Sequence, residues 1–401
     1  MATSNYKRVS QKRVCRVCGK PDWCSYTPDE KISFCARITT GADRVSRTGW
    51  GVFYHEKLLF PIEPLPFPRR PSPKKAEIAP PEIRDFAYRK LIELAPASRS
   101  KEIIDGPKGL RARKILDFES YGSLPQAEAE RRELAKIIRN SVNRQFPDYV
   151  RKRKSAIAGL PGFWIDKSGK VRLWTEKDYG CPLMLIPYRN ENGLVQACQI
   201  RFMCRAISGE SNFRYVWLST PEKSNGIGCG SPLHFTKPKG ATSKKPFLIT
   251  EGALKAETAQ VFKPDFDVIA SGGVTCSHDE IIAQTRFRPL YLGFDNDCAE
   301  NAHVARAIAK LITSRFDDGV RYGYDGRVRI LAWDKKAKGI DDALLGKISI
   351  SSITPREWFT SLSLLCRDEV EKFFKPEMEM KSFFLASRRL LNNKNSADNA
   401  V

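Results

Sequence analysis

The chain has 401 residues, of which 41% are hydrophobic, and this is enough apolar material for two or three domains with cores of their own. No run of about 18 apolar residues occurs and the first residues lack an apolar segment, so we expect neither a membrane span nor a secretory signal, but a cytoplasmic protein. The formal net charge is +22 and falls within residues 1–246, which indicates a nucleic-acid partner, the alternative being a basic protein that is merely soluble.

Four cysteines near the N-terminus predict a metal site. The eleven cysteines are an odd number, and four crowd between residues 15 and 35, which favours metal in a reducing compartment over disulfides. Cys15, Cys18, Cys24 and Cys35 have the spacing C-x2-C-x5-C-x10-C, in which the first pair turns two thiolates onto one ion and the later pair closes a tetrahedron. We expect a zinc-binding module over residues 1–60, with partial coordination, or His55 in place of one cysteine, as alternatives.

Basic and aromatic residues interleave in the same module. Such a composition is suited to stacking bases and neutralising phosphates, although the aromatic rings are equally suited to packing around the zinc. The residues are Lys12, Arg13, Arg16, Trp23, Tyr26 and Trp50.

A proline-rich segment separates this module from a helical region. Residues 61–82 contain eight prolines and are predicted to form an extended linker. Residues 83–150 have helical periodicity, and one apolar face is formed by Leu134, Ile137, Ile138 and Val142. The opposite face carries Arg131, Arg132, Lys136, Arg139 and Arg144, and RKRK follows at 151–154. These charges either contact a nucleic-acid backbone or are simply solvated.

Residues 151–246 have the pattern of a basic, β-containing platform for nucleic acid or nucleotides. Short β-rich runs are separated by turn residues at 167–169 and 190–193. Between Cys181 and Pro246 the acidic residues are only three glutamates. The arginines Arg189, Arg201, Arg205 and Arg214 are therefore expected on a surface that faces phosphates.

Residues 247–350 alternate short apolar runs with helix-like segments, as in a parallel sheet. Glu251 follows the run FLIT, and Gly252 allows a sharp turn into a helix. The glycines after Ser271 indicate either a close approach by a ligand or a tight strand-to-helix turn.

Acidic residues end these runs. Asp295 and Asp297 follow LYLGF, and Asp341 and Asp342 follow a later strand. Because the carboxyl ends of parallel strands form the ligand crevice of an open α/β sheet, we expect these acids to meet Glu251 there. Their hard oxygen ligands favour Mg²⁺ or Mn²⁺. Residues 351–401 are expected to be a helical tail with a disordered end, in which KSFFLASRRLL docks a partner or packs on the sheet.

These motifs resemble the TOPRIM domain of DnaG-type bacterial primases, topoisomerases and some nucleases. By this resemblance Glu251, Asp295 and Asp297 are the catalytic acidic triad, and Asp341 and Asp342 in KGIDDALL are auxiliary acids. Upstream, LIPYRNENGLVQACQIRF and RYVWLSTPE resemble the basic half of a primase core, in which Arg201 and Arg214 contact template or nucleotide phosphates. The order of the parts is similar to that in TOPRIM proteins of phages, plasmids and integrative elements.

The resemblance implies an α/β fold, α+β upstream, and a primase that makes short RNA primers. Its cofactors would be Mg²⁺ or Mn²⁺ and Zn²⁺, and its partners a single-stranded DNA template, ribonucleoside triphosphates and a replicative helicase in trans, in a bacterial or phage-infected cell. The chain departs from the family pattern at Lys255, where primases usually have an acid and where a lysine binds phosphate or offsets one metal ion. The zinc spacing also differs from the primase pattern. The alternatives are a TOPRIM nuclease and a single-strand-binding replication or mobilisation factor without polymerase activity.

Overall fold

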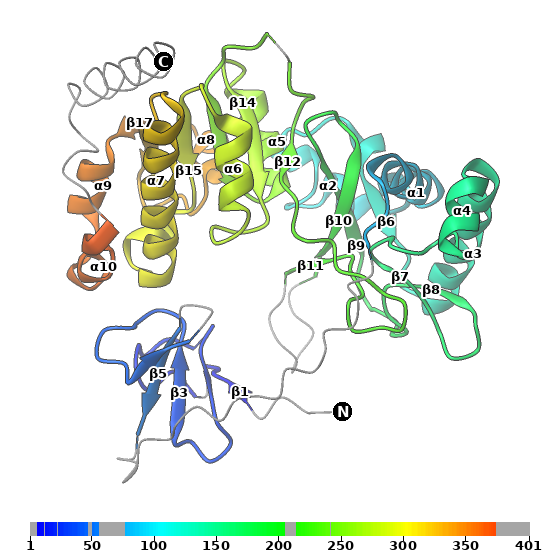
Figure 1. Cartoon of the computed structure of the whole chain (residues 1–401), viewed down its shortest axis with the longest axis horizontal. Coiled ribbons are helices and arrows are strands. Elements are labelled where there is room, and N and C mark those ends of the chain that lie inside the picture. The colour runs from blue at the N-terminus through cyan, green and yellow to red at the C-terminus, as the bar shows by residue number, and fades with distance from the viewer. Residues whose placement is uncertain are drawn as a thin grey trace, which may run out of the picture.

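The computed structural model describes residues 6–11, 13–21, 23–46, 50–55, 77–204, 214–240 and 242–373. For Asp297, Cys298 and Lys372 it describes the backbone but not the side chain. Most of the predicted proline-rich linker, Arg205 and the segment KSFFLASRRLL lie outside the described residues. Figure 1 shows a small N-terminal module in blue, a mixed part in cyan and green, and a sheet flanked by helices in green to orange.

The N-terminal module, which we call the cysteine module, consists of the described residues between 6 and 55. Its antiparallel sheet has the order β1-β2-β3-β5-β4. The strands are β1 (Lys7–Arg8), β2 (Ser25–Tyr26), β3 (Ile32–Cys35), β4 (Arg44–Val45) and β5 (Gly51–Tyr54). Its buried cluster is small and consists of Val9, Cys15, Cys24, Cys35 and Ala36. So little buried apolar surface agrees with the expectation that a metal ion stabilises this module.

The second part, which we call the platform, spans the described residues from 77 to 233. Its helices are α1 (Pro81–Leu94), α2 (Lys101–Asp105), α3 (Glu128–Gln145) and α4 (Pro147–Arg153). Its strands are β6 (Gly122–Leu124), β7 (Phe163–Ile165), β8 (Val171–Leu173), β9 (Leu183–Arg189), β10 (Val195–Phe202) and β11 (Tyr215–Trp217). The antiparallel sheet has the order β11-β10-β9-β6, and β7 and β8 form a separate hairpin.

Alternation along β9 places its side chains on two different cores. Leu183 and Leu185 pack with α1 and α3, whereas Met184, Ile186 and Tyr188 pack with Ala253 and Leu254 of the next part. The period of two in a strand accounts for this division, because successive side chains point to opposite faces. The platform sheet is therefore covered on one face by α1 and α3, and on the other by α2 together with the start of α5 (Ala253–Phe262).

The third part contains a six-stranded, mainly parallel sheet of order β12-β14-β13-β15-β16-β17. Its strands are β12 (His234–Phe235), β13 (Phe247–Glu251), β14 (Asp267–Ser271), β15 (Leu290–Gly293), β16 (Val328–Trp333) and β17 (Ile350–Ile353). The four central strands are parallel, and the edge strands β12 and β17 are antiparallel to their neighbours. Strand β12 comes from the range that the sequence assigned to the platform.

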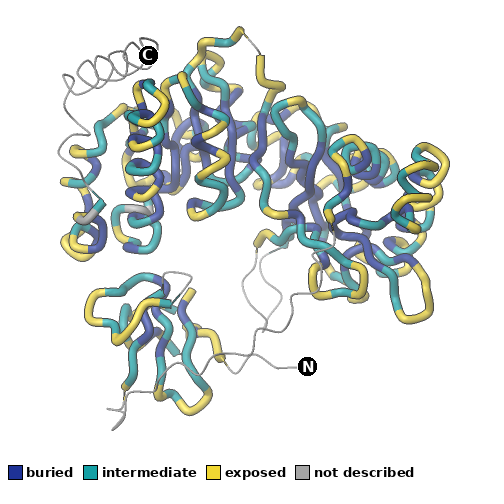
Figure 2. Tube along the Cα trace, viewed as in Figure 1, coloured by how far each residue is buried: buried dark blue, intermediate teal, exposed yellow. Residues whose placement is uncertain are grey.

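Helices cover both faces of this sheet. They are α5 (Ala253–Phe262), α6 (His278–Thr285), α7 (Ala302–Tyr322), α8 (Ile340–Leu345), α9 (Pro355–Ser361) and α10 (Leu364–Val370). Phe247 and Ile249 pack with α6, α7, α9 and α10, while Leu248 packs with α5 and α8. In Figure 2 the central strands β13, β14 and β15 are mostly buried, and the exposed residues lie on helices and loops around them. The predicted α/β fold class, with a cysteine cluster near the N-terminus and mixed sheets flanked by helices, is confirmed.

Two expectations for the helical region differ from the structure. Ile137 was placed on the apolar face of α3, but its side chain is exposed, and Ala135 is buried instead. Arg131 was placed on the polar face, yet it is fully buried and donates hydrogen bonds to the backbone carbonyls of Pro125 and Gln126. These carbonyls belong to the chain entering the helix, and their need for donors outweighs the cost of burying the guanidinium.

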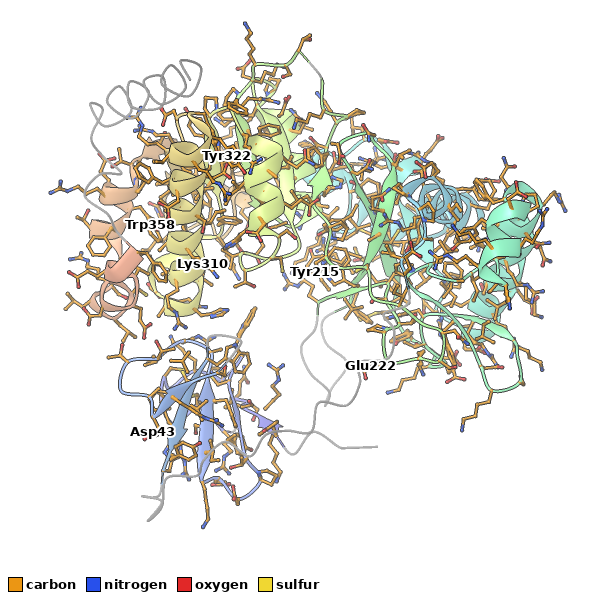
Figure 3. The ribbon with its side chains drawn as sticks, viewed as in Figure 1. Asp43, Tyr215, Glu222, Lys310, Tyr322 and Trp358 are labelled. Carbon is orange, nitrogen blue, oxygen red and sulfur yellow. A yellow bond between two sulfur atoms is a disulfide. The ribbon has the colours of Figure 1, made fainter. Side chains whose placement is uncertain are left out.

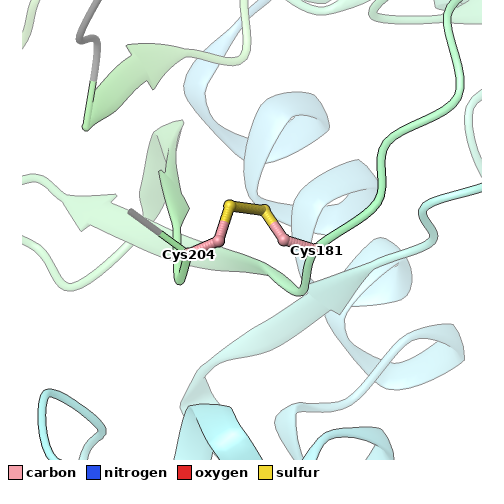
Figure 4. The surroundings of a disulfide bond; sticks show 2 residues. All are labelled: Cys181 and Cys204. Carbon is pink, nitrogen blue, oxygen red and sulfur yellow. A yellow bond between two sulfur atoms is a disulfide. The ribbon is translucent and has the colours of Figure 1, made fainter. Parts of the chain in front are cut away.

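The structure contains a disulfide where the sequence predicted only reduced cysteines. Cys181 and Cys204 lie before β9 and after β10, with their Cα atoms 5.8 Å apart, and are bonded to each other (Figure 4). These two strands are antiparallel neighbours, so the pairing brings their ends together although the cysteines are 23 residues apart. The other cysteines whose side chains are described are free. Among the described helices none is both long and apolar enough to cross a membrane.

The cysteine module contacts the last described helices. Glu369 in α10 accepts hydrogen bonds from the backbone N–H of Thr39 at 2.8 Å and of Thr40 at 2.9 Å. Both threonine hydroxyls donate to the same carboxylate, and Arg306 in α7 lies 3.3 Å from it. In Figure 1 the module accordingly lies beside the ends of α7 and α10. A buried carboxylate with this many donors fixes the position of the module.

Candidate metal and nucleotide site

The end of β13 positions the first predicted acid. Glu251 is the last residue of the strand, and Gly252 follows it as the N-cap of α5 with φ 84° and ψ 141°. This combination is essentially restricted to glycine. The predicted sharp turn at Gly252 is therefore present, and it leaves Glu251 partly exposed at the carboxyl edge of the sheet.

The neighbouring strand positions the second acid. Asp295 is the second residue after β15, and its exposed fraction is only 5%. The side chain of Asn296 donates to the carbonyls of Trp333 and Ala337, which ties the loop after β15 to the loop after β16. Asp297 lies in a short 3-10 helix (Asn296–Ala299), and its side chain is outside the described residues. The structure thus brings Asp295 to the predicted edge of the sheet. That Asp297 is a metal ligand stays a prediction.

Lys255, in the first turn of α5, lies among the acids. Its Nζ donates a hydrogen bond to Oδ1 of Asp295. Burial alone would lower the pKa of Lys255, but the charge and hydrogen bond of Asp295, followed by the charges of Glu251 and Asp341, raise it above its usual value. The lysine therefore stays protonated at neutral pH. The predicted phosphate-binding Lys255 is engaged with the acids in this structure.

The two later acids have different surroundings. Asp341, at the start of α8, is 2% exposed, and its Oδ2 accepts a hydrogen bond of 2.6 Å from Nη1 of Arg113. Its Oδ1 has no hydrogen-bond partner among the described residues. Asp342 is exposed and accepts from the backbone N–H of Gly339. Of this pair, only Asp341 joins Glu251 and Asp295, and we call these three residues the acidic cluster.

Arg113 is a site residue that the sequence analysis missed. It belongs to a 3-10 helix (Arg111–Arg113) in the range predicted as a helical basic region, and it reaches Asp341, 228 residues later. The carbonyl of Arg113 also accepts a hydrogen bond from Thr258 in α5. No local pattern signals such a contact, because its two halves come from different parts of the chain.

The predicted phosphate-binding arginines lie next to this cluster. Arg201 in β10 is 2% exposed, and its guanidinium lies 5.5 Å from the ring centre of Tyr215. Burial lowers the pKa of Arg201; the nearby charges of Arg113 and Arg214 lower it further, and Asp341 opposes them. Nε and Nη1 of Arg201 have no hydrogen-bond partner among the described residues. Unpaired buried donors are costly, which fits a group that awaits an acceptor.

Strand β11 presents the remaining basic residue. Arg214, just before it, is exposed, and Tyr215 is 36% exposed. Figure 3 places Tyr215 between the platform and the six-stranded sheet. Trp217, two residues after Tyr215 on this strand, packs against Gly272. A Cβ at Gly272 would lie 2.7 Å from the Trp217 ring. A side chain at position 272 would therefore clash with Trp217, which is a packing reason for glycine there.

Arg189 does not lie on the expected phosphate-facing surface. Its guanidinium pairs with Glu257 in α5 at 2.9 Å, and the ring Nε2 of His234 lies 3.0 Å from the same carboxylate oxygen. The backbone N–H of Arg189 donates to Nδ1 of His234, so Nε2 carries the proton and donates to Glu257. The half-buried Arg189 and Glu257, together with the buried His234, join the platform to α5.

The four predicted cysteines of the N-terminal module converge. The sulfur atoms of Cys15, Cys18, Cys24 and Cys35 all lie within 4.8 Å of one another. The neighbouring thiols of Cys15, Cys24 and Cys35 lower the pKa of Cys18. Such a donor set fits a tetrahedral zinc ion.

The surroundings of these sulfurs suit a metal-bound thiolate. The backbone N–H groups of Ala36 and Ile38 point at Cys24 and Cys35, with N to S distances of 3.4 and 3.3 Å. His55 instead contacts the Ser33 hydroxyl. The four-cysteine set is thus favoured over the alternatives with fewer cysteines or with His55.

The interleaved aromatic residues of this module divide between the two predicted uses. Trp23 is 59% exposed, as a base-stacking platform requires. Tyr26 instead lies 4.6 Å beneath the guanidinium of Arg13, and Trp50 packs against the cysteine cluster.

No protein-family model matches the sequence, and no curated protein matches it. Several solved structures are similar to this one, each at low sequence identity. A DNA primase domain from Pseudomonas aeruginosa is 17% identical, with a TM-score of 0.44, covering 70% of this chain and 81% of that one. The zinc-binding and RNA polymerase domains of the Aquifex aeolicus primase are 14% identical, with a TM-score of 0.42, covering 96% and 93%. The RNA polymerase domain of the Mycobacterium tuberculosis primase DnaG, in complex with a double-stranded DNA oligomer with an overhang, is 15% identical, with a TM-score of 0.43, covering 72% and 84%. These structural neighbours are DnaG-type primase domains.

Proposed function

We propose that the chain is a primase-like TOPRIM protein that synthesises short RNA primers on single-stranded DNA. In this proposal residues 247–350 form the metal-binding catalytic domain, and the platform holds the template and the incoming ribonucleoside triphosphate. The cysteine module binds zinc and helps to grip DNA. The protein acts in the cytoplasm of a bacterial or phage-infected cell, with a replicative helicase in trans.

One observation carries the proposal: carboxylates and unpaired arginine donors meet where the platform contacts the six-stranded sheet. Glu251 and Asp295 lie at the ends of neighbouring parallel strands. The negative charge of Asp341 acts on both Lys255 and Arg201. A site that holds cations on one side and phosphates on the other is what nucleotidyl transfer requires.

The roles follow from these positions. Glu251, Asp295 and Asp297 would hold Mg²⁺ or Mn²⁺, since carboxylate oxygens suit these ions and Glu251 and Asp295 lie at one sheet edge. A bound ion would lower the pKa of a nucleotide 3′-hydroxyl and neutralise charge on a triphosphate. Arg201, whose Nε and Nη1 have no hydrogen-bond partner among the described residues, would donate to phosphate oxygens. Arg113 positions Asp341 and does not itself need to touch the substrate.

The test is primer synthesis on a single-stranded DNA template with ribonucleoside triphosphates and Mg²⁺ or Mn²⁺. Asp295→Asn should reduce the yield of short oligomers by about 100-fold, the usual effect of losing one electrostatic contact to the transition state. Asp334→Asn is the matched control, because Asp334 follows the neighbouring strand β16 but is exposed and bonds only locally to the N–H of Lys336. Its activity should equal that of the wild type. Absence of oligomers from the wild-type protein would overturn the proposal.

A second function is favoured by the pairing of Lys255 with Asp295, since an ammonium already neutralises this acid. In that case the chain would be a single-strand-binding replication or mobilisation factor. Template binding that is unchanged by Glu251→Gln and Asp295→Asn, with no synthesis by the wild type, would favour it. Metal-dependent cleavage without added nucleotides would instead identify a TOPRIM nuclease.

A further inference from the structure

A buried lysine takes up space inside the acidic cluster. The Nζ of Lys255 bonds to Asp295, whose side chain is 7% exposed, while the lysine side chain is itself only 23% exposed. The surroundings of Gly339 show how closely these side chains pack. A Cβ at Gly339 would lie 3.1 Å from Cε of Lys255, 3.2 Å from Oδ1 of Asp295 and 2.6 Å from Oδ1 of Asp341. The end of the lysine and two carboxylates therefore surround one point.

Oδ1 of Asp341 supports a cation position at this point. It is buried and has no hydrogen-bond partner among the described residues, whereas Oδ2 of the same carboxylate is paired with Arg113. A buried carboxylate oxygen without a donor is costly, unless a positive charge lies close by. Lys255 supplies such a charge, and the charge of Asp341 acts on it together with those of Glu251 and Asp295.

The charges limit how many further cations the cluster can accept. Among the described residues, Lys255 is bonded to Asp295 and Arg113 to Asp341, so cations of low exposure already pair with two of the three carboxylates. A divalent ion placed against Asp295 on the lysine side would meet an ammonium at contact distance, where two like charges of low exposure repel strongly. Lys255 therefore excludes a divalent ion from the position that its ammonium occupies against Asp295.

We infer that the Lys255 ammonium occupies one cation position of the acidic cluster, so that this chain binds a single divalent ion there. The inference rests on the proposed function for the role of that ion. The ammonium of Lys255 would replace a second metal ion in two tasks. It would hold Asp295 in place and neutralise phosphate charge. As a positioning residue it sets the metal stoichiometry of the site.

A nearby lysine provides a matched control. Lys338 lies 3.9 Å from Oδ2 of Asp295, the other oxygen of the same carboxylate, but its side chain is 68% exposed. A solvated ammonium at this distance contributes little to the local charge. Removing Lys338 changes the formal charge of the region as much as removing Lys255 does, without opening the buried position.

The experiment counts Mn²⁺ bound to the full, zinc-loaded chain by electron paramagnetic resonance of the free ion. Binding that is lost in Asp295→Asn is assigned to the acidic cluster. The wild type and Lys338→Gln should each bind one Mn²⁺ in that cluster. Lys255→Gln should bind its ion at least tenfold more tightly, and Lys255→Asp should bind two. Thermal unfolding of each variant checks that it is folded, and the near-isosteric Gln variant keeps the test valid if Asp destabilises the chain.

Two ions in the wild-type cluster, or no ion at all, would overturn the inference. So would equal Mn²⁺ affinity in the wild type and Lys255→Gln. The first of these results leaves the proposed primer synthesis intact, because a two-ion site serves it equally well. Conversely, one ion in the wild type and two in Lys255→Asp, with no primers made, would support the inference while the proposed function fails.

Discussion

At the scale of single residues, buried charges in this protein are matched by partners from another part of the chain. Asp295 bonds to Lys255, Asp341 to Arg113, and Glu257 to both Arg189 and His234. Removing one member of such a pair leaves the other buried and uncompensated, which costs about 3–5 kcal/mol. The pairs of Asp341 with Arg113 and of Glu257 with Arg189 hold the platform and the six-stranded sheet in register more than they add net stability.

His234 should make stability depend on pH. Burial lowers the pKa of His234 below its usual value of 6.5, and the bond to Glu257 only partly opposes this. The unfolded chain then binds the proton more readily, so the free energy of unfolding should fall as the pH drops through 6.5. The slope due to this one group is at most about 1.4 kcal/mol per pH unit. Urea unfolding between pH 8 and 5 measures it.

The comparison is with His234→Gln, whose curve should be flatter. Burial also lowers the pKa of His278 and of His303, so some slope will remain in the variant. The difference between the two curves isolates His234. Parallel curves would mean that His234 is not neutral and buried as the structure has it.

Sequence reasoning reached the acids of the site but not all of their partners. Glu251 and Asp295 were predictable because each follows an apolar run, and neighbouring parallel strands end at the same edge. Arg113 was not, because its contact with Asp341 depends on how two distant segments pack. Arg189 was wrongly placed on a surface, since its buried counter-charge, Glu257, is 68 residues away.

At the scale of elements, turns and central strands were predictable and edges were not. The turn at Gly169 between β7 and β8 and the turn at Gly193 between β9 and β10 have the positive φ that only glycine adopts easily. By contrast, the two-residue strand β12 has no sequence pattern of its own, and only its pairing with β14 defines it. On α3 the periodicity predicted the buried face but not which of two adjacent residues, Ile137 or Ile138, is exposed.

Replacing Gly252 tests how the sheet presents Glu251. A Cβ at Gly252 would contact nothing within 4 Å, so Gly252→Ala introduces no clash. Its φ of 84° with ψ of 141° is nevertheless strained for alanine, and we expect a loss of about 1–3 kcal/mol in the free energy of unfolding. Urea denaturation measures the loss.

Gly180→Ala is the control for this substitution. Gly180 is also free of neighbours within 4 Å, but its backbone does not have a positive φ. Its stability should change by less than about 0.5 kcal/mol. Equal effects at both glycines would show that backbone strain at Gly252 is not the cause.

At the scale of the whole molecule, the cysteine module is joined to α10 through the carboxylate of Glu369 and to α7 through Arg306, which donates to the Thr39 hydroxyl. Glu369 is 3% exposed and accepts from the N–H and hydroxyl groups of Thr39 and Thr40. Burial alone would raise the pKa of Glu369, but these bonds and the charge of Arg306 lower it below its usual value of 4.5. Docking should therefore be independent of pH at neutrality and weaken only in acid, as the carboxylate takes up a proton.

Glu369→Ala should release the cysteine module. Loss of a buried, hydrogen-bonded charge costs about 2–5 kcal/mol of docking free energy, which shifts the equilibrium towards the undocked form. Small-angle X-ray scattering should then give a larger radius of gyration, with the unfolding of the platform unchanged. Glu371→Ala, an exposed glutamate two residues later, should scatter like the wild type. If both variants keep the wild-type radius, the carboxylate is not what fixes the module.

The contact between Thr39 and Glu369 can form only late in synthesis of the chain. These residues are 330 positions apart in the chain. At a synthesis rate of about 5–20 residues per second, the module leaves the ribosome roughly half a minute before α10 does. During that interval the docking partner in α10 has not been made, so the contact with Glu369 cannot help the module to fold. A nascent chain would therefore carry the module before its docking partner is made, and docking would wait for the last described helix, α10.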